Sequence, residues 1–352
     1  MSSERRPTLR QVAARAGVSI GTASGVLSDK GSASRETRAA VVAAAEALGY
    51  TRRSRPRIRA MPTMLTTAGI IARRLHFPSP VNPFYMEVLN GAQRACADLG
   101  IALTLETVED PDDGRLPLVV SRRQAQGLVV LGSLDDRFIR RLLDAGTPCV
   151  TVDHTVDDLP VDCVRSEDEH GGYLATQALL ELGHTDPPPA MIVGLPELRP
   201  LADRVAGYRR ALAEHGLRVP PRYVQRSADL SFPAGRAAMD QLLDLPTAPT
   251  AVFASNDSTA LGALEALRTQ GIAVPEQCSV IGYDDMEMAA HSPPPLTTVH
   301  VDIDLLGAQG IWHLVQRVAA PSMTRRVTHL GVRLVTREST AAPPSRGRRP
   351  IG

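Results

Sequence analysis

Apolar residues recur with a helical period over the first 48 residues of the chain. They fall on one face of residues 8–16 and again of residues 19–27, and Gly17 between the two segments permits the left-handed backbone of a tight turn. Ser19 is suited to cap the second helix, and a third helix is predicted over residues 34–48. A helix, a glycine turn and a second helix form the helix-turn-helix pattern, whose second helix lies in the major groove of DNA.

Beyond residue 66 the pattern changes to short apolar strands that alternate with amphipathic helices. This alternation predicts an α/β fold with parallel sheets. It occurs in two similar series, before and after residue 164. We therefore expect two doubly wound parallel-sheet lobes, with the chain crossing between them more than once.

These patterns divide the chain into a headpiece, a linker, a two-lobed body and a tail. The predicted bounds are 1–50 for the headpiece, 51–62 for the linker, 63–340 for the body and 341–352 for the tail. Within the body, we expect one lobe over about 63–163 plus 296–322 and the other over about 164–295 plus 323–340. The tail is rich in proline, serine and arginine and lacks leucine heptads, which favours disorder over a coiled coil.

Charge is distributed unevenly along the chain. Residues 1–60 hold 12 Lys and Arg against 4 Asp and Glu, a net charge of +8, so the rest of the chain carries −7 to give the total of +1. A basic head on a mildly acidic body is typical of a protein whose head alone binds nucleic acid. The basic charge and the third helix favour a DNA-binding motif over an ordinary helical hairpin at this position.

Composition otherwise matches a globular protein, with 43% hydrophobic and 22% charged residues in 352. The cysteines Cys96, Cys149, Cys163 and Cys278 are scattered, and no Cys/His cluster has zinc spacing. They are expected to be reduced core residues, and we expect neither a metal nor a cofactor. The N-terminal stretch MSSERRPTLR has no apolar core of a signal peptide, and no stretch is long enough to cross a bilayer. We therefore expect a cytoplasmic protein with no membrane partner.

Several ordered motifs resemble those of lactose-repressor-type (LacI/GalR family) transcription regulators. The motifs are TLRQVAARAGVSIGTASGVLS, SRETRAAVVAAAEALGY, VNPFY, ADRVAGYRRAL, FASNDSTALGALEAL, VPEQCSVIGYDD, PPLTTVHVD and VTREST. Together they span residues 8–340. The resemblance implies a body like the type I periplasmic binding proteins and a homodimer that binds a pseudo-palindromic operator in double-stranded DNA. It also implies a repressor whose operator affinity is modulated by a small molecule, a sugar or related polyol, bound between the lobes.

The residues expected to contact DNA lie on the second helix, at its flanks and in the linker. They are Thr8, Ser19, Ile20, Gly21, Thr22, Ser24, Gly25, Ser28, Arg53, Arg55, Arg57, Ile58 and Arg59. Gly21 and Gly25 stand where the family commonly carries larger or polar side chains, and an arginine in place of Gly25 is common. Direct base readout is therefore expected to be weaker than in a typical member, with Ile20 able to meet a thymine methyl group.

The linker departs from the family as well. Members usually form a hinge helix here that wedges a leucine into the minor groove, but Pro56 disfavours a helix and Arg59 takes the place of the leucine. One alternative is that Ile58 is the wedge. Another is that the linker arginines follow phosphates or enter a narrow minor groove, and a third is a disordered basic linker in the free protein.

Candidate ligand-binding residues follow the predicted strands of the body, where doubly wound sheets bind their ligands. They are Phe84, Tyr85, Asp153, Arg204, Asn256 and Asp284. Helix capping by Asn256 and core packing by Phe84 are the alternatives for those residues. The guanidinium of Arg204 is suited to hydroxyls or to a carboxylate. The resemblance implies that Arg204 and Asp284 contact the effector.

One residue argues against a typical sugar site. Leu230 stands where some sugar-responsive members place a stacking tryptophan, and aromatic residues make up only 3% of the chain. A nucleoside or a small polyol is therefore a further candidate for the effector.

Parts of the sequence are compatible with three other functions. A solute-binding transport component would carry a signal peptide and no basic headpiece. A DNA-binding protein with degenerate base readout is suggested by the two glycines of the second helix and by the linker. A glycosidase would need two paired carboxylates, but Asp284 and Asp285 point to opposite faces of an extended strand. The sequence also has no nucleophile elbow or phosphate loop, so we predict that the protein is not an enzyme.

Overall fold

The computed structural model describes residues 9–27, 33–48, 65–74, 83–109, 114–156, 158–195 and 198–344. The chain divides into two compact units, Met1–Pro62 and Thr63–Gly352. The predicted linker, residues 51–62, lies outside the described residues.

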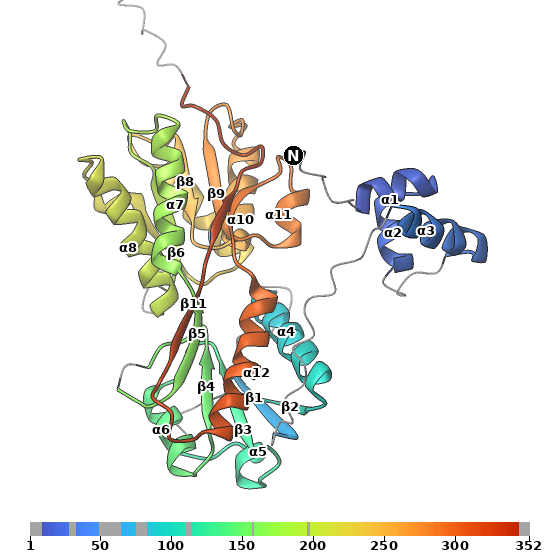
Figure 1. Ribbon diagram of the computed structural model, residues 1–352. Coiled ribbons are helices and arrows are strands. Elements are labelled where there is room, and N and C mark those ends of the chain that lie inside the picture. Colours follow the sequence, from blue (N-terminus) through green and yellow to red (C-terminus); the bar gives the residue numbers. More distant parts are fainter. Residues whose placement is uncertain are drawn as a thin grey trace, which may run out of the picture. The chain divides into compact units, whose positions relative to one another are not determined.

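The first unit contains the predicted helices (Figure 1). They are α1 (Leu9–Ala16), α2 (Ile20–Leu27) and α3 (Arg35–Ala47). Gly17 joins α1 to α2 with a φ of +66°, and the amide of Val18 donates to the carbonyl of Ala13 at 3.1 Å. Small apolar residues from all of these helices form one core, which includes Val12, Ala23 and Val41.

The second unit contains two lobes, each built on a six-stranded sheet in the part of the chain that is described. The first sheet is wholly parallel. Its strands, in spatial order, are β11 (Val327–Leu330), β5 (Asp162–Ser166), β4 (Cys149–Val152), β3 (Gly127–Leu131), β1 (Thr67–Arg73) and β2 (Ala102–Val108).

The second sheet is parallel except for one edge strand, β12, which pairs antiparallel to β10. Its strands, in spatial order, are β12 (Arg333–Val335), β10 (Thr297–His300), β9 (Ser279–Asp284), β8 (Ala251–Ala254), β6 (Ala190–Gly194) and β7 (Val224–Ser227). The inner strands of both sheets are fully buried, as expected where helices cover both faces of a sheet.

Helices flank each sheet (Figure 1). Those of the first lobe are α4 (Phe84–Leu99), α5 (Leu118–Ser121), α6 (Asp136–Asp144) and α12 (Ile303–Ala319). Those of the second lobe are α7 (Asp168–Glu181), α8 (Arg199–Glu214), α9 (Phe232–Leu243), α10 (Asp257–Thr269), α11 (Glu287–His291) and the 3₁₀ helix η2 (Pro221–Tyr223). Helix α8 packs closely on α7, because Gly172 and Gly207 bring the two backbones together.

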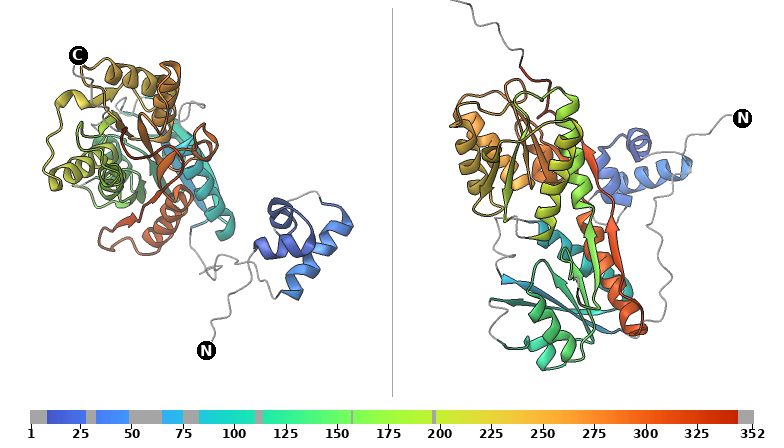
Figure 2. Two further views of the ribbon diagram at one scale, coloured as in Figure 1. Left: turned by 90° about the horizontal axis from the view of Figure 1, so that it is seen from above. Right: turned by 90° about the vertical axis from the view of Figure 1, so that its left-hand side faces the viewer.

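The chain passes between the lobes after β5, after β10 and after β11 (Figure 2). The amide of Glu167, between β5 and α7, donates to the carbonyl of Leu330 at the end of β11 with a length of 3.0 Å. The two lobes lie one above the other in the view of Figure 1, and residues that follow the carboxyl ends of parallel strands in both sheets meet at the junction between them.

The lobes differ from the predicted bounds at two strands. Residues 297–300 were expected in the first lobe, but β10 pairs with β9 in the second sheet. Residues 327–330 were expected in the second lobe, but β11 pairs with β5 in the first sheet. The residues of a strand this short do not specify a sheet, so only pairing with distant residues decides the lobe to which β10 and β11 belong.

The start of the predicted disordered tail is ordered. The amide of Ala341 donates to the hydroxyl of Ser279 at 3.0 Å, and the carbonyl of Ala341 lies 2.9 Å from Nε2 of His184. Composition alone missed this docking because the partners of Ala341 lie in distant segments. Residues 345–352 lie outside the described residues.

All of the cysteines are buried, and burial raises the thiol pKa of Cys149 and of Cys278 to about 12. No helix in the described part of the chain is long and apolar enough to span a bilayer. Within the same residues, no group of His, Cys, Asp and Glu has the arrangement of a metal site.

Candidate functional site

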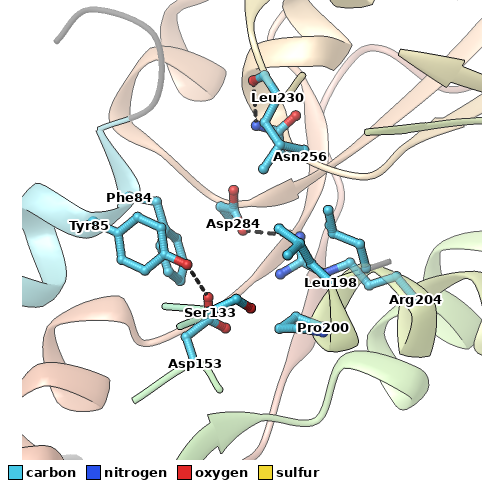
Figure 3. Close-up of a pocket in the computed structure, with 11 residues that line it drawn as sticks. Phe84, Tyr85, Ser133, Asp153, Leu198, Pro200, Arg204, Leu230, Asn256 and Asp284 are labelled. Carbon is cyan, nitrogen blue, oxygen red and sulfur yellow. Dashed lines mark hydrogen bonds and ion pairs between the residues drawn. The ribbon is translucent and has the colours of Figure 1, made fainter. Parts of the chain in front are cut away.

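A pocket lies between the two lobes at the carboxyl ends of their strands (Figure 3). The space between its lining atoms, counted together with the open solvent at its mouth, is about 420 Å³. The first lobe contributes Phe84, Tyr85, Ser133 and Asp153, and the second contributes Leu198, Pro200, Leu201, Arg204, Leu230, Asn256 and Asp284. Every candidate ligand-binding residue from the sequence therefore lines this one pocket.

Leu230, which the family resemblance places where some members carry a stacking tryptophan, also lines the pocket, whereas Ser133, Leu198, Pro200 and Leu201 were not predicted from the sequence. Ser133 follows β3, so the rule that ligands bind beyond strand ends was sufficient to find it. Leu198, Pro200 and Leu201 lie at the start of α8, one turn before Arg204. The predicted helix begins only at residue 202, so no sequence signal placed these three residues in a pocket.

Two aspartates reach the pocket from opposite lobes on unusual backbone conformations. Asp153 follows β4 with a φ of +61°, and Asp284 ends β9 with a φ of +108°. Non-glycine residues rarely adopt positive φ, and such strain is commonly found at functional sites. Oδ1 of each aspartate is buried and accepts no hydrogen bond within the described residues. The pocket therefore presents two unsatisfied acceptor oxygens, one from each lobe.

The aromatic side of the pocket holds Asp153 in place. The hydroxyl of Tyr85 donates to Oδ2 of Asp153 at 2.7 Å, and the rings of Phe84 and Tyr85 meet edge to face at 5.2 Å. Burial, and next the nearby Asp168, raise the pKa of the Asp153 carboxyl to about 6, although the Tyr85 hydrogen bond and Arg204 lower it. Asp153 therefore titrates close to neutral pH.

Arg204 is buried and held by several groups at once. Its Nε donates to Asp168 at 3.0 Å, and its Nη1 donates to the carbonyl of Ser255 at 2.5 Å. Nη1 also lies 3.6 Å from Oδ1 of Asp284, and the guanidinium carbon lies 3.6 Å from the centre of the Tyr283 ring. Burial alone would lower the pKa of Arg204, but the surrounding carboxylates, Asp168 first, raise it.

Asp284 faces the pocket while its neighbour Asp285 does not. Burial raises the pKa of Asp284 well above its usual value, although Arg204 lowers it. Asp285 instead contacts Nδ1 of His300 at 2.9 Å and pairs with Arg337 at 2.5 Å. The doublet therefore does not form a pair of carboxylates in one site.

Asn256 both caps a helix and lines the pocket. Its Oδ1 accepts from the amide of Thr259 at 3.1 Å, at the first turn of α10, and its Nδ2 donates to the carbonyl of Leu230 at 3.0 Å. The side chain of Leu230 lines the pocket, so this wall is aliphatic and offers no ring on which a sugar can stack.

The predicted DNA-binding residues are placed only in part. Ile20 opens α2 with 49% of its surface exposed, and Gly21 is also exposed. The Ser19 hydroxyl accepts from the amide of Thr22 at 3.0 Å, which makes it the cap of α2, and it lies 2.8 Å from the Thr22 hydroxyl. Ser24 and Gly25 belong to α2, but the side chain of Ser24 and the exposure of Gly25 are not described. The remaining predicted DNA-binding residues lie outside the described residues, and they are Thr8, Ser28, Arg53, Arg55, Arg57, Ile58 and Arg59.

Comparison with known families and proteins gives consistent matches along the chain. Residues 8–53 match the family of bacterial regulatory proteins, lacI family, and residues 176–340 match the periplasmic binding protein-like domain. The ribose operon repressor of Escherichia coli strain K12 is 33% identical over 336 residues, covering 94% of this chain and 99% of that protein.

Solved structures resemble the whole chain as well. A complex of the transcriptional regulator CelR with cellobiose is 33% identical, with a TM-score of 0.69 over 95% of this chain and 100% of that one. The lac repressor dimer bound to operator and an anti-inducer is 28% identical, with a TM-score of 0.67 over 96% of this chain and 100% of that one.

Proposed function

This chain belongs to the lacI family of bacterial regulatory proteins, and we propose from that premise that it represses transcription under the control of a sugar or related polyol. The effector binds in the pocket between the lobes. The protein acts in the cytoplasm as a homodimer whose two headpieces bind a pseudo-palindromic operator. Its pocket serves binding rather than catalysis.

One observation carries the effector assignment. Asp153 and Asp284 come from opposite lobes and line the pocket together with Arg204, and each has a buried carboxyl oxygen that accepts no hydrogen bond within the described residues. The hydroxyls of a polyol can donate to both aspartates and accept from the guanidinium at the same time. Such a ligand connects the two lobes. Because it binds one relative arrangement of the lobes more tightly than another, it shifts the population of the protein toward the tighter-binding arrangement.

The headpiece supports a second, weaker candidate function. The hydroxyls of Ser19 and Thr22 are bonded to each other at the start of α2, and Gly21 has no side chain with which to read a base. Ile20 is therefore the exposed side chain that we expect to contact a thymine methyl group. A protein with so few base contacts binds DNA mainly through phosphates and DNA shape.

Selection of bound duplexes from a random DNA pool tests both candidates. We expect the full chain to enrich a pseudo-palindrome, and a sugar that binds the pocket to change its affinity for that duplex. Arg204→Gln should abolish the response to the sugar while leaving operator binding in its absence intact. Recovery of no motif, with binding that depends on salt but hardly on sequence, would instead establish the weakly specific DNA-binding protein.

A further inference from the structure

We propose that Asp168 makes this pocket selective for uncharged effectors, because it occupies a donor of Arg204 that an anionic ligand would need. The inference rests on the proposed function and narrows its ligand to a neutral polyol or sugar. It excludes sugar phosphates, uronic acids and nucleotides. Asp168 does not line the pocket and acts through Arg204, so its role is that of a positioning residue.

The first argument is the geometry of the guanidinium. An arginine grips a carboxylate or a phosphate with two parallel N–H groups, either Nε with Nη2 or Nη1 with Nη2. In Arg204 the single N–H of Nε donates to Asp168, and one of the two N–H groups of Nη1 donates to the carbonyl of Ser255. The edge formed by Nε and Nη2 is therefore closed to a two-donor grip. Nη1 also lies 3.6 Å from Oδ1 of Asp284, so an anion at the edge formed by Nη1 and Nη2 would lie beside that carboxyl group. Nη2 has no hydrogen bond within the described residues and can donate to hydroxyl oxygens.

The second argument is that Arg204 has no room to reorient. The Tyr283 ring lies against the guanidinium with its centre 3.6 Å from the central carbon. The backbone of Arg204 packs on α7 at Gly172, where a larger residue would overlap its carbonyl. The other oxygen of Asp168 lies 3.4 Å from Nη2 of Arg165, which holds this carboxylate from the opposite side. Asp168 and Arg204 therefore form one fixed assembly.

The third argument is charge. Asp153, Asp168 and Asp284 are all buried around one guanidinium, and the nearby Arg165 is itself paired with Asp203. An anionic ligand would bring further negative charge into a buried site that already holds an excess of carboxylates. A neutral polyol instead donates hydroxyls to the unsatisfied oxygens of Asp153 and Asp284.

Matched pairs of sugars test the selectivity by calorimetry with the full-length protein. The pairs are D-ribose with D-ribose 5-phosphate, D-glucose with D-glucuronate and D-galactose with D-galacturonate. The uncharged methyl ester of each uronate separates the effect of charge from that of size. We expect at least one neutral sugar to bind and its anionic counterpart to bind ~100-fold more weakly, with the methyl ester close to the neutral sugar.

Two variants then test the role of Asp168. Asp168→Asn keeps an oxygen near Nε but removes the charge, and Asp168→Ala also frees Nε. We expect the preference for the neutral sugar to fall ~10-fold in the first variant and further in the second. Should Asp168→Ala fail to fold, Asp168→Asn alone decides. The control is Glu169→Gln, the next residue on α7, whose exposed carboxylate pairs with Arg210 and should leave the preference unchanged.

The outcomes separate this inference from the proposed function. An anionic sugar that binds as tightly as its neutral partner and changes operator binding overturns the selectivity but leaves the regulated repressor standing. If the preference for the neutral sugar is unchanged in Asp168→Asn, the selectivity comes from other residues, and the proposed role of Asp168 is wrong. If no sugar binds or changes operator binding, the proposed sugar response fails and this inference fails with it.

Discussion

At the scale of single residues, the pocket is defined by carboxylates placed where their ionisation is costly. Asp153 is the clearest example. Burial raises the pKa of its carboxyl group to about 6, while Oδ2 accepts a hydrogen bond from the hydroxyl of Tyr85. The other oxygen has no partner within the described residues. A ligand hydroxyl that donates to it stabilises the ionised form and so competes with a proton.

Effector affinity should therefore depend on pH. Because the pKa of Asp153 is raised, the folded free protein holds a proton there below pH 6 and loses the associated stability as the pH rises through 6. An effector that needs the ionised carboxylate should bind up to ~10-fold more tightly at pH 7.5 than at pH 5. Calorimetry across this range measures the slope, which Asp153→Asn should flatten. A flat profile in the unaltered protein would contradict the assignment.

At the scale of elements, the position of Arg204 depends on how closely α8 packs on α7. Gly207 on α8 faces the backbone of Glu169 on α7, and a Cβ at this position would overlap the carbonyl oxygen. Neither helix can move without displacing a pocket residue or Asp168. The packing of two helices therefore fixes the geometry of the site.

Gly207→Ala should consequently lower the free energy of unfolding of the second unit by about 3 kcal/mol. The control is Gly21→Ala at an exposed position of α2, where the nearest atom to an added Cβ is Oγ of Ser19 at 3.7 Å. This variant should stabilise the headpiece by ~1 kcal/mol through helix propensity. Urea unfolding of the full chain, followed by circular dichroism, measures both. A loss below ~0.5 kcal/mol in Gly207→Ala would show that α8 shifts without strain.

At the scale of the whole molecule, an ion pair joins the two lobes next to the pocket. Arg165 lies on β5 of the first lobe and pairs with Asp203 on α8 of the second, directly before Arg204. Arg165 also donates to the hydroxyl of Thr155 in its own lobe. The pair therefore couples the arrangement of the lobes to the helix that carries the pocket arginine.

Removing this pair should loosen the lobes in the absence of effector. We expect Arg165→Gln to lower the free energy of unfolding by about 2 kcal/mol, because it leaves the buried Asp168 with Arg204 as its remaining arginine partner and Asp203 with Arg199. Small-angle scattering should show a larger radius of gyration. Arg210→Gln breaks an exposed pair with Glu169 in one lobe and should change stability by less than ~0.5 kcal/mol and leave the scattering unaltered. Equal effects of the two variants would contradict the inter-lobe role.

The sequence by itself determined the family, the helix-turn-helix and the polar and aromatic residues from the strand ends and from α8 that meet in the pocket, but not Ser133 or the apolar start of α8. Local signals were sufficient for these features. Helical spacing around Gly17 specifies the turn, and polar residues at strand ends, such as Asp153 and Asp284, must gather at one edge when parallel strands share a sheet.

Only the tertiary structure decided to which lobe β10 and β11 belong. It also decided which hydrogen-bond donors of Arg204 remain available to a ligand. The pairing of β11 with β5 joins residues about 160 positions apart, and Asp168 bonds Arg204 across 36 positions. From its residue type alone, Arg204 suited a hydroxyl or a carboxylate equally well. Asp168 on α7 and Ser255, the residue after β8, restrict that choice. A hydrogen-bond donor that is already engaged within the fold is not available to a ligand.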